Sequence, residues 1–234
     1  MDGGINDMED VGRQTAETLR TFKDADYAKQ LEQALAQKTA LLHEIDHRVK
    51  NNLQLIASLL QLQSRRIPDE ATRQTVRGIL ERVNAIGAVH RRLFQGGDVQ
   101  RFAVAEFVRD LAGDLAAAAR RDDIQLKLDL EPVAVPASSA APMALVVNEL
   151  ISNSLKHAFP AERPGEVAIC IRNVGERFEI IVADNGVGMP AEAPRGFGTT
   201  IVQLLCQQLK AQFTQSDNQP GVRSVVSVPL EKLA

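Results

Sequence analysis

The chain of 234 residues contains no tryptophan, one tyrosine and two cysteines. So few aromatic side chains disfavour a stacking platform for single-stranded nucleic acid. Cys170 and Cys206 are far apart and form no Cys-x-x-Cys pair, which excludes a disulfide framework or a zinc site as an organising feature. Apolar runs such as 140–147 are far shorter than the roughly 20 residues that a membrane-spanning helix needs.

Neither sign of charge is in large excess, since the net charge is only −3. The chain therefore has no global basic field for a nucleic-acid partner. Its first ten residues are acidic and lack an apolar segment, so we expect no secretory signal. A hydrophobic share of 44% and a charged share of 24% permit a buried core. These features predict a cytoplasmic globular protein with no membrane segment.

The first half of the sequence predicts a helical hairpin. Residues 1–26 read as a flexible lead-in that becomes helical near Thr15, and 27–66 contain neither Pro nor Gly. Within 27–66 apolar side chains recur at alternating steps of four and three, an imperfect heptad typical of bundled helices. Pro68 ends this helix. The apolar heptad positions are Leu31, Leu35, Leu42, Ile45, Val49, Ile56 and Leu59, and polar Lys38, Asn52 and Gln63 fill the remaining positions.

A second helix is expected over 69–94, and the short link at 67–69 makes the pair antiparallel. Its apolar stripe comprises Val76, Ile79, Leu80, Val83, Ile86, His90 and Leu93. Two helices alone cannot bury both stripes, so we expect a homodimer whose hairpins, over 27–97, form a four-helix bundle. The alternative is a hairpin that packs on the second half of its own chain.

Beyond a break at 95–98 the pattern changes to mixed helices and strands. The hairpin turns at 174–176 and 220–221 indicate antiparallel pairing, so 98–234 predict an α+β sandwich with helices on one face of a sheet. The expected helices are 104–121, 140–159 and 199–211, and the expected strands are 124–130, 166–173, 177–183, 213–216 and 222–228.

Three polar residues share one face of the helix expected over 140–159. Glu149, Asn153 and Lys156 lie at positions i, i+4 and i+7. An amide oxygen suits Mg²⁺, and an ammonium group suits phosphate. Taken alone, an exposed polar helix face would give the same pattern.

Two glycine motifs follow in an order that strengthens this interpretation. Asp184 ends an apolar strand and precedes Gly186 and Gly188, which allow a ligand or another backbone to come close. After seven intervening residues, 196–200 supply glycines at a helix start, where free N–H groups and the helix dipole favour phosphate. Together the motifs predict a nucleotide held between a helix and a glycine-hinged lid.

These segments resemble a known family. NELISNSLKH, DNGVG and RGFGTTIV resemble the N, G1 and G2 boxes of the GHKL ATPases, which implies the Bergerat ATP-binding sandwich. EIDHRVKNNLQLIASLLQLQ resembles the histidine-containing helix of the HisKA_2 sensor histidine kinases, relatives of the HWE kinases. The resemblance runs over about 41–230.

The resemblance implies that His47 is the phosphoacceptor. His47 lies two positions after the heptad residue Ile45, off the apolar stripe, and a neutral imidazole is a usable nucleophile near pH 7. Arg48 and Lys50 could orient the incoming phosphate. His43, one turn earlier, is the competitor and lacks the flanking match.

The same resemblance implies roles in nucleotide binding. It assigns Asn153 to Mg²⁺, Asp184 to the adenine amine, Lys156 and His157 to the surroundings of the phosphates, and Gly186, Gly188, Gly196, Gly198 and Thr199 to lid and phosphate contacts. Glu149 occupies the position of a water-activating base in other GHKL ATPases, and in a kinase it would instead polarise the histidine or a metal-bound water.

The implied protein is a histidine autokinase that uses ATP and Mg²⁺ and passes the phosphoryl group to an aspartate of a response-regulator receiver. Its input signal would either be missing from this chain or enter from a partner through residues 1–40. The alternatives are a phosphotransfer adaptor with a degenerate ATP domain and a regulator dominated by phosphatase activity. A short lid over 189–195, together with Val222 and Pro220 at positions where the family has other residues, suggests an altered affinity for ATP.

Overall fold

The computed structural model describes residues 4–95, 101–160, 163–189 and 197–230. Contacts between residues divide the chain into two units, Met1–Val49 and Lys50–Ala234. No helix within the described ranges is long and apolar enough to cross a membrane. Most of the break expected at 95–98 and most of the short lid lie outside the described residues.

The first unit consists of helix α1, Gly4–Ser64, which continues into the second unit. It begins at Gly4, so the expectation that the chain becomes helical only near Thr15 is wrong. Between Gly4 and residue 27, where the predicted Pro- and Gly-free segment begins, the sequence contains one further glycine, Gly12. One glycine costs a helix only about 1 kcal/mol relative to alanine, which does not stop propagation through polar helix-forming residues.

The heptad side chains of α1 are largely exposed in the single chain. Leu31, Leu35 and Ile45 keep 71%, 63% and 51% of their surface accessible to solvent. An apolar stripe of this length is unusual on the surface of an isolated soluble chain. It is therefore a surface that a further copy of the chain could cover.

Helix α2, Glu70–Gln95, follows the link that contains Pro68. Asp69 caps it, because its carboxylate accepts hydrogen bonds from the backbone N–H of Thr72 at 2.7 Å and from the Thr72 hydroxyl at 2.6 Å. These bonds favour the ionised carboxylate and lower the pKa of Asp69. The link and its cap therefore produce the helical turn that the sequence predicts.

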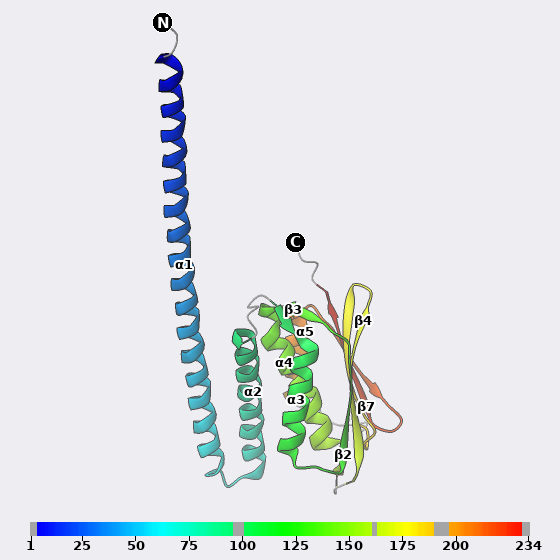
Figure 1. Ribbon diagram of the computed structural model, residues 1–234. Helices are drawn as coiled ribbons and strands as arrows, with labels where there is room; N and C mark the ends of the chain where they lie inside the picture. Colours follow the sequence, from blue (N-terminus) through cyan, green and yellow to red (C-terminus); the bar gives the residue numbers. More distant parts are fainter. Residues whose placement is uncertain (1–3, 96–100, 161–162, 190–196, 231–234) are drawn as a thin grey trace. The chain divides into compact units, whose positions relative to one another are not determined.

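The rest of the second unit is a layered α+β domain, as predicted (Figure 1). Five strands form a sheet in the order β2-β4-β5-β7-β6, in which β2 and β4 are parallel and the other neighbours antiparallel. A separate ribbon, β1 with β3, was not predicted because each of its strands has three residues. The bounds are β1 Arg101–Ala103, α3 Val104–Ala119, β2 Ile124–Leu130, β3 Ala134–Pro136, α4 Ala137–His157, β4 Gly165–Val174, β5 Arg177–Asp184, α5 Phe197–Gln208, β6 Gln212–Asp217 and β7 Val222–Pro229.

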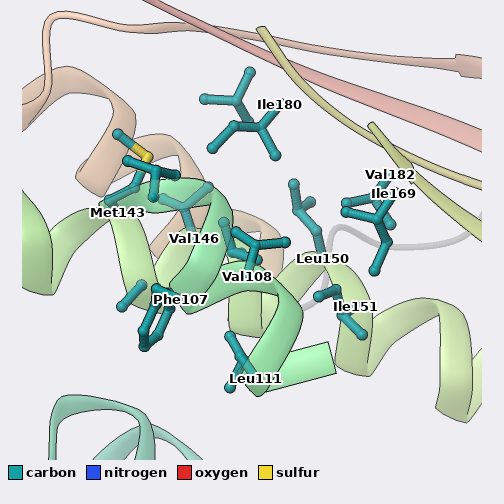
Figure 2. Packing of buried hydrophobic residues seen from close by; sticks show 14 of the residues in the cluster. Phe107, Val108, Leu111, Met143, Val146, Leu150, Ile151, Ile169, Ile180 and Val182 are labelled. Carbon is teal, nitrogen blue, oxygen red and sulfur yellow. The ribbon is translucent and has the colours of Figure 1, made fainter. Parts of the chain in front are cut away.

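The main core lies between the sheet and the helices on one of its faces (Figure 2). Alternate residues of β4 point inward, so Ile169 is fully buried while its neighbour Cys170 is half-buried. They meet α4 residues such as Met143 and Leu150, and α3 adds Val108. Each such burial contributes about 1.5–3 kcal/mol, and together these contacts fix α4 against the sheet.

Helix α2 packs against α4 of its own chain. Its residues Ala85 and Val89 are each 2% exposed, and both lie outside the predicted apolar stripe. Ile79, in the stripe, is 39% exposed. Within the second unit, α2 thus packs on the second half of its own chain, as the alternative to a dimeric bundle expects. The predicted apolar stripe of α2 is only partly covered by this packing.

Candidate functional site

The predicted polar face of α4 meets the predicted glycine-rich start of α5. Glu149 is 6% exposed, Asn153 half-buried and Lys156 exposed. A side chain at Gly198 would place its Cβ 2.8 Å from Glu149 Oε2 and 3.7 Å from the amide atoms of Asn153. Glycine therefore keeps space open beside a carboxylate and an amide, at a helix start where a phosphate would be favoured.

Asp184 ends β5 and is 3% exposed. Its Oδ1 accepts hydrogen bonds from the backbone N–H groups of Gly186 at 3.0 Å and Val222 at 3.2 Å, and its Oδ2 accepts one from the Ser154 hydroxyl at 3.0 Å. A carboxylate offers about four acceptor positions, and the bonds from the described residues use three of them, which leaves one for an exocyclic amine. Ser154 and the backbone of Val222 were not predicted, since only the folded sheet brings them to Asp184.

Close backbone approach explains two glycines around this carboxylate. A Cβ at Gly186 would lie 2.2 Å from the carbonyl oxygen of Ala158, just after α4. At Gly221 a Cβ would lie 1.9 Å from the carbonyl oxygen of Asp184, and φ there is +104°. These contacts hold the ends of α4, β5 and β7 together around the site.

Replacing Gly186 with alanine should destabilise the second unit by about 1–3 kcal/mol, because the new methyl group would overlap backbone atoms. Gly113→Ala is the matched control. A Cβ at Gly113 meets nothing within 4 Å, and in the interior of α3 alanine should stabilise by about 1 kcal/mol. Urea unfolding measures both changes. Equal effects of the two substitutions would contradict the close approach at Gly186.

The remaining predicted nucleotide residues lie around the same helix ends. His157 is exposed in the last turn of α4, and Thr199 is half-buried in the first turn of α5. Gly188 has φ +76°, in the left-handed region that favours glycine. Gly196 lies outside the described residues.

Helix α2 contributes two charged residues to the site that the motifs did not indicate. Arg82 donates from Nε to Glu149 Oε1 and from Nη2 to Oε2, both at 2.8 Å, and its guanidinium lies 5.4 Å from the ring centroid of Phe197. Lys156 Nζ donates to Glu81 Oε2 at 2.5 Å. Adjacent residues of α2 thus pair with two charged groups of the predicted site.

The predicted acceptor His47 is exposed on α1 in the first unit. Arg48 is paired with Glu44, one turn earlier, through contacts of 3.0 and 2.5 Å. This ion pair is exposed and contributes little stability, so water or phosphate can compete for the arginine. Lys50 is half-buried at the start of the second unit.

Other features of the described residues do not compete with this site. A cavity of about 1090 Å³ lies between α2, α3 and the β1–β3 ribbon, and none of the predicted site residues lines it. Its lining mixes Arg101 and Arg109 with Glu106 and Asp110, so the charges largely compensate. No group of three or more His, Cys, Asp or Glu side chains among the described residues could hold a metal. A divalent cation would depend on Asn153 and on phosphate oxygens, which suits Mg²⁺.

Comparison with known proteins explains this arrangement. The family model HisKA_2, described as histidine kinase, matches residues 44–119. A second model, described as histidine kinase-, DNA gyrase B-, and HSP90-like ATPase, matches 139–232. The chain belongs to the histidine kinase family. The two matches contain His47 and the predicted nucleotide residues, respectively.

Curated relatives in this family are longer proteins. The chain is 31% identical over 218 residues to the sensor histidine kinase PdtaS of Mycobacterium tuberculosis, which covers 89% of the chain and 43% of the relative. It is 26% identical to blue-light-activated histidine kinase 2 of Erythrobacter litoralis, over 82% of the chain and 57% of that protein. The chain thus spans less than half of the mycobacterial kinase.

Among solved structures, the histidine kinase domain of the Erythrobacter litoralis EL346 blue-light-activated histidine kinase is similar in fold. Its TM-score is 0.62 at 24% identity, over 82% of this chain and 92% of that domain. The likeness confirms the predicted fold class, a helical region followed by the sandwich of the histidine kinase catalytic domain.

Proposed function

We propose that this histidine kinase chain transfers the γ-phosphoryl group of ATP to His47. The observation that carries the proposal is the meeting of three separate motifs within one unit. Glu149 and Asn153 of α4 lie beside Gly198 of α5, and the bonds from described residues leave one acceptor position on Asp184 at the end of β5. These residues fit a nucleotide with its adenine at Asp184 and its phosphates at the start of α5.

In the proposed reaction, a neutral ring nitrogen of His47 attacks the γ-phosphorus, the bond to the β–γ bridging oxygen breaks, and ADP leaves. Mg²⁺ bound with ATP would neutralise charge on the phosphate oxygens. Asn153 would hold the cation through its amide oxygen, and Lys156 would face the phosphates. The chain contributes mainly positioning and electrostatics, as in other phosphoryl transfers.

The direct test is incubation with γ-labelled ATP and Mg²⁺, followed by acid treatment of the labelled protein. A phosphoramidate on histidine is acid-labile, whereas phosphoserine and phosphothreonine survive acid. We expect a label that acid removes. Nucleotide binding without any label would favour the phosphotransfer adaptor, because an adaptor receives its phosphoryl group from another protein.

The partners we propose follow from the same reaction. A phosphohistidine needs an acceptor, and an aspartate of a response-regulator receiver would supply it. We also propose a cytoplasmic homodimer, supported by the exposed heptad residues of α1, among them Leu59 at 52% exposure. Covering such side chains in a bundle would remove them from water.

The substitution Ile56→Glu should weaken this dimer. Ile56 is 45% exposed and lies in the heptad stripe, so a charge there would be buried at the bundle seam. We expect light scattering to give a dimer for the wild type and a mass nearer 25.5 kDa for the variant. Gln61→Glu adds one negative charge to an exposed position of α1 outside the heptad stripe and tests whether any added negative charge has this effect. A wild-type monomer at micromolar concentration would refute the dimer.

A further inference from the structure

Helix α2 places a cation on a carboxylate of the proposed phosphate site. Arg82 uses two different nitrogens to reach both oxygens of Glu149 at 2.8 Å, and the two side chains are only 18% and 7% exposed. A bidentate pair of this kind is geometrically fixed and weakly screened. The stacking of Arg82 on Phe197 also ties the arginine to the first residue of α5.

This pairing changes what Glu149 can do. A carboxylate beside a bound γ-phosphate can act as a general base if one of its oxygens accepts a proton from a water molecule. In the structure each oxygen already accepts a hydrogen bond of 2.8 Å from the guanidinium, and the bidentate pair fixes the orientation of the carboxylate. The docked helix therefore occupies two of the carboxylate's roughly four acceptor positions and restricts where a water molecule could give up its proton.

We propose that Arg82 is a positioning residue that prevents Glu149 from activating water and so suppresses ATP hydrolysis; this inference rests on the proposed function. In the suppressed reaction a water oxygen bonds to the γ-phosphorus, the bond to the β–γ bridging oxygen breaks, and ADP leaves. The proton of the water passes to Glu149. With the arginine in place, His47 remains the nucleophile to which the phosphoryl group can go.

The neighbouring ion pair supports the same role for α2. Glu81 lies next to Arg82 in the chain and binds Lys156, which is seven residues after Glu149 on α4. Two adjacent residues of opposite charge therefore match two residues of opposite charge on the facing helix. This complementarity sets the position of α2 along α4 and brings Arg82 to Glu149 rather than to a neighbouring turn.

The test measures ADP formation in a His47→Gln background, in which transfer to histidine is removed. Adding Arg82→Met should raise the kcat of hydrolysis roughly tenfold or more, because a positioned general base contributes about 10²–10⁴. The KM for ATP should change little. Arg82→Lys, which keeps the charge but not the bidentate geometry, should give a smaller rise, and adding Glu149→Gln to Arg82→Met should abolish it.

Two controls separate this role from a merely structural one. Arg77→Met, on the same helix, removes an exposed arginine whose partner is Glu70, and it should leave hydrolysis unchanged. In the protein without nucleotide, Arg82→Met should lower Tm because Glu149 stays buried without its cation, and adding Glu149→Gln should restore part of the loss. Arg82→Lys keeps the test available if Arg82→Met does not fold.

Calorimetric titration with ATP distinguishes a failure of the role proposed for Arg82 from a failure of the proposed function. Nucleotide binding with unchanged or slower hydrolysis in both Arg82 variants would overturn the role of Arg82 and leave the proposed function standing. A rise in hydrolysis that persists after Glu149→Gln would also overturn it, because water would then be activated without Glu149. Absence of nucleotide binding in the wild type and in every variant would overturn the proposed function and this inference together.

Discussion

Labelling of the protein by γ-labelled ATP is expected to disappear when His47 is replaced by glutamine. Glutamine keeps a polar, exposed side chain on α1 but has no nucleophilic ring nitrogen. Affinity for ATP should remain at the wild-type value, because His47 belongs to the first unit and the proposed nucleotide residues belong to the second. The measurement is the acid-labile label per chain, with calorimetry for the nucleotide.

His43→Gln is the matched control, since it changes the same residue type one helical turn earlier. It should retain labelling. If His43→Gln removes the label and His47→Gln keeps it, the acceptor has been assigned to the wrong histidine. Retained acid-labile label in both variants would place the acceptor elsewhere in the chain.

The second large effect is expected at Asp184. Asp184→Asn should weaken ATP binding by about 1.5–3 kcal/mol, roughly 10–150-fold, because a charge-assisted bond to the adenine amine is lost. The asparagine oxygen can still accept from Gly186 and Val222, and its amide can donate to Ser154, so the loop keeps its hydrogen bonds. Calorimetric titration with ATP measures the loss.

A second aspartate separates this effect from a general change in charge. Asp129 lies on β2, largely exposed and paired with Arg172, which lowers the pKa of its carboxyl group. Asp129→Asn should therefore leave ATP affinity unchanged. Unchanged affinity in Asp184→Asn as well would contradict the adenine site as placed here.

Much of the fold could be predicted because local pattern and packing agree in this chain. The alternating residues of β4 and the turns at 174–176 and 220–221 specify hairpins that the structure contains. The parallel pairing of β2 with β4 was not predicted, since nothing local distinguishes it from antiparallel pairing. The early start of α1 was missed because polar composition was interpreted as flexibility.

In the predicted site, too, the features set by local sequence could be predicted and those set by tertiary contacts could not. Spacing on α4 places Glu149 and Asn153 on one face, and glycines mark the start of α5, so their meeting could be anticipated. The pairing of Glu149 with Arg82 could not, because the two residues are 67 positions apart and Arg82 belongs to no recognised motif. A charged pair, Glu81 and Arg82, facing a charged pair on α4 is visible only after folding.

The packing of α2 on α4 has a consequence for dividing or recombining the chain. A fragment that begins at Asp98, the expected start of the ATP-binding half, would lack the helix that carries Ala85 and Val89. The surface of α4 that α2 covers would then face water, together with an unneutralised Glu149. The smallest autonomously folding piece should therefore begin before Glu70, and exchange of the catalytic half between related kinases should carry α2 with it.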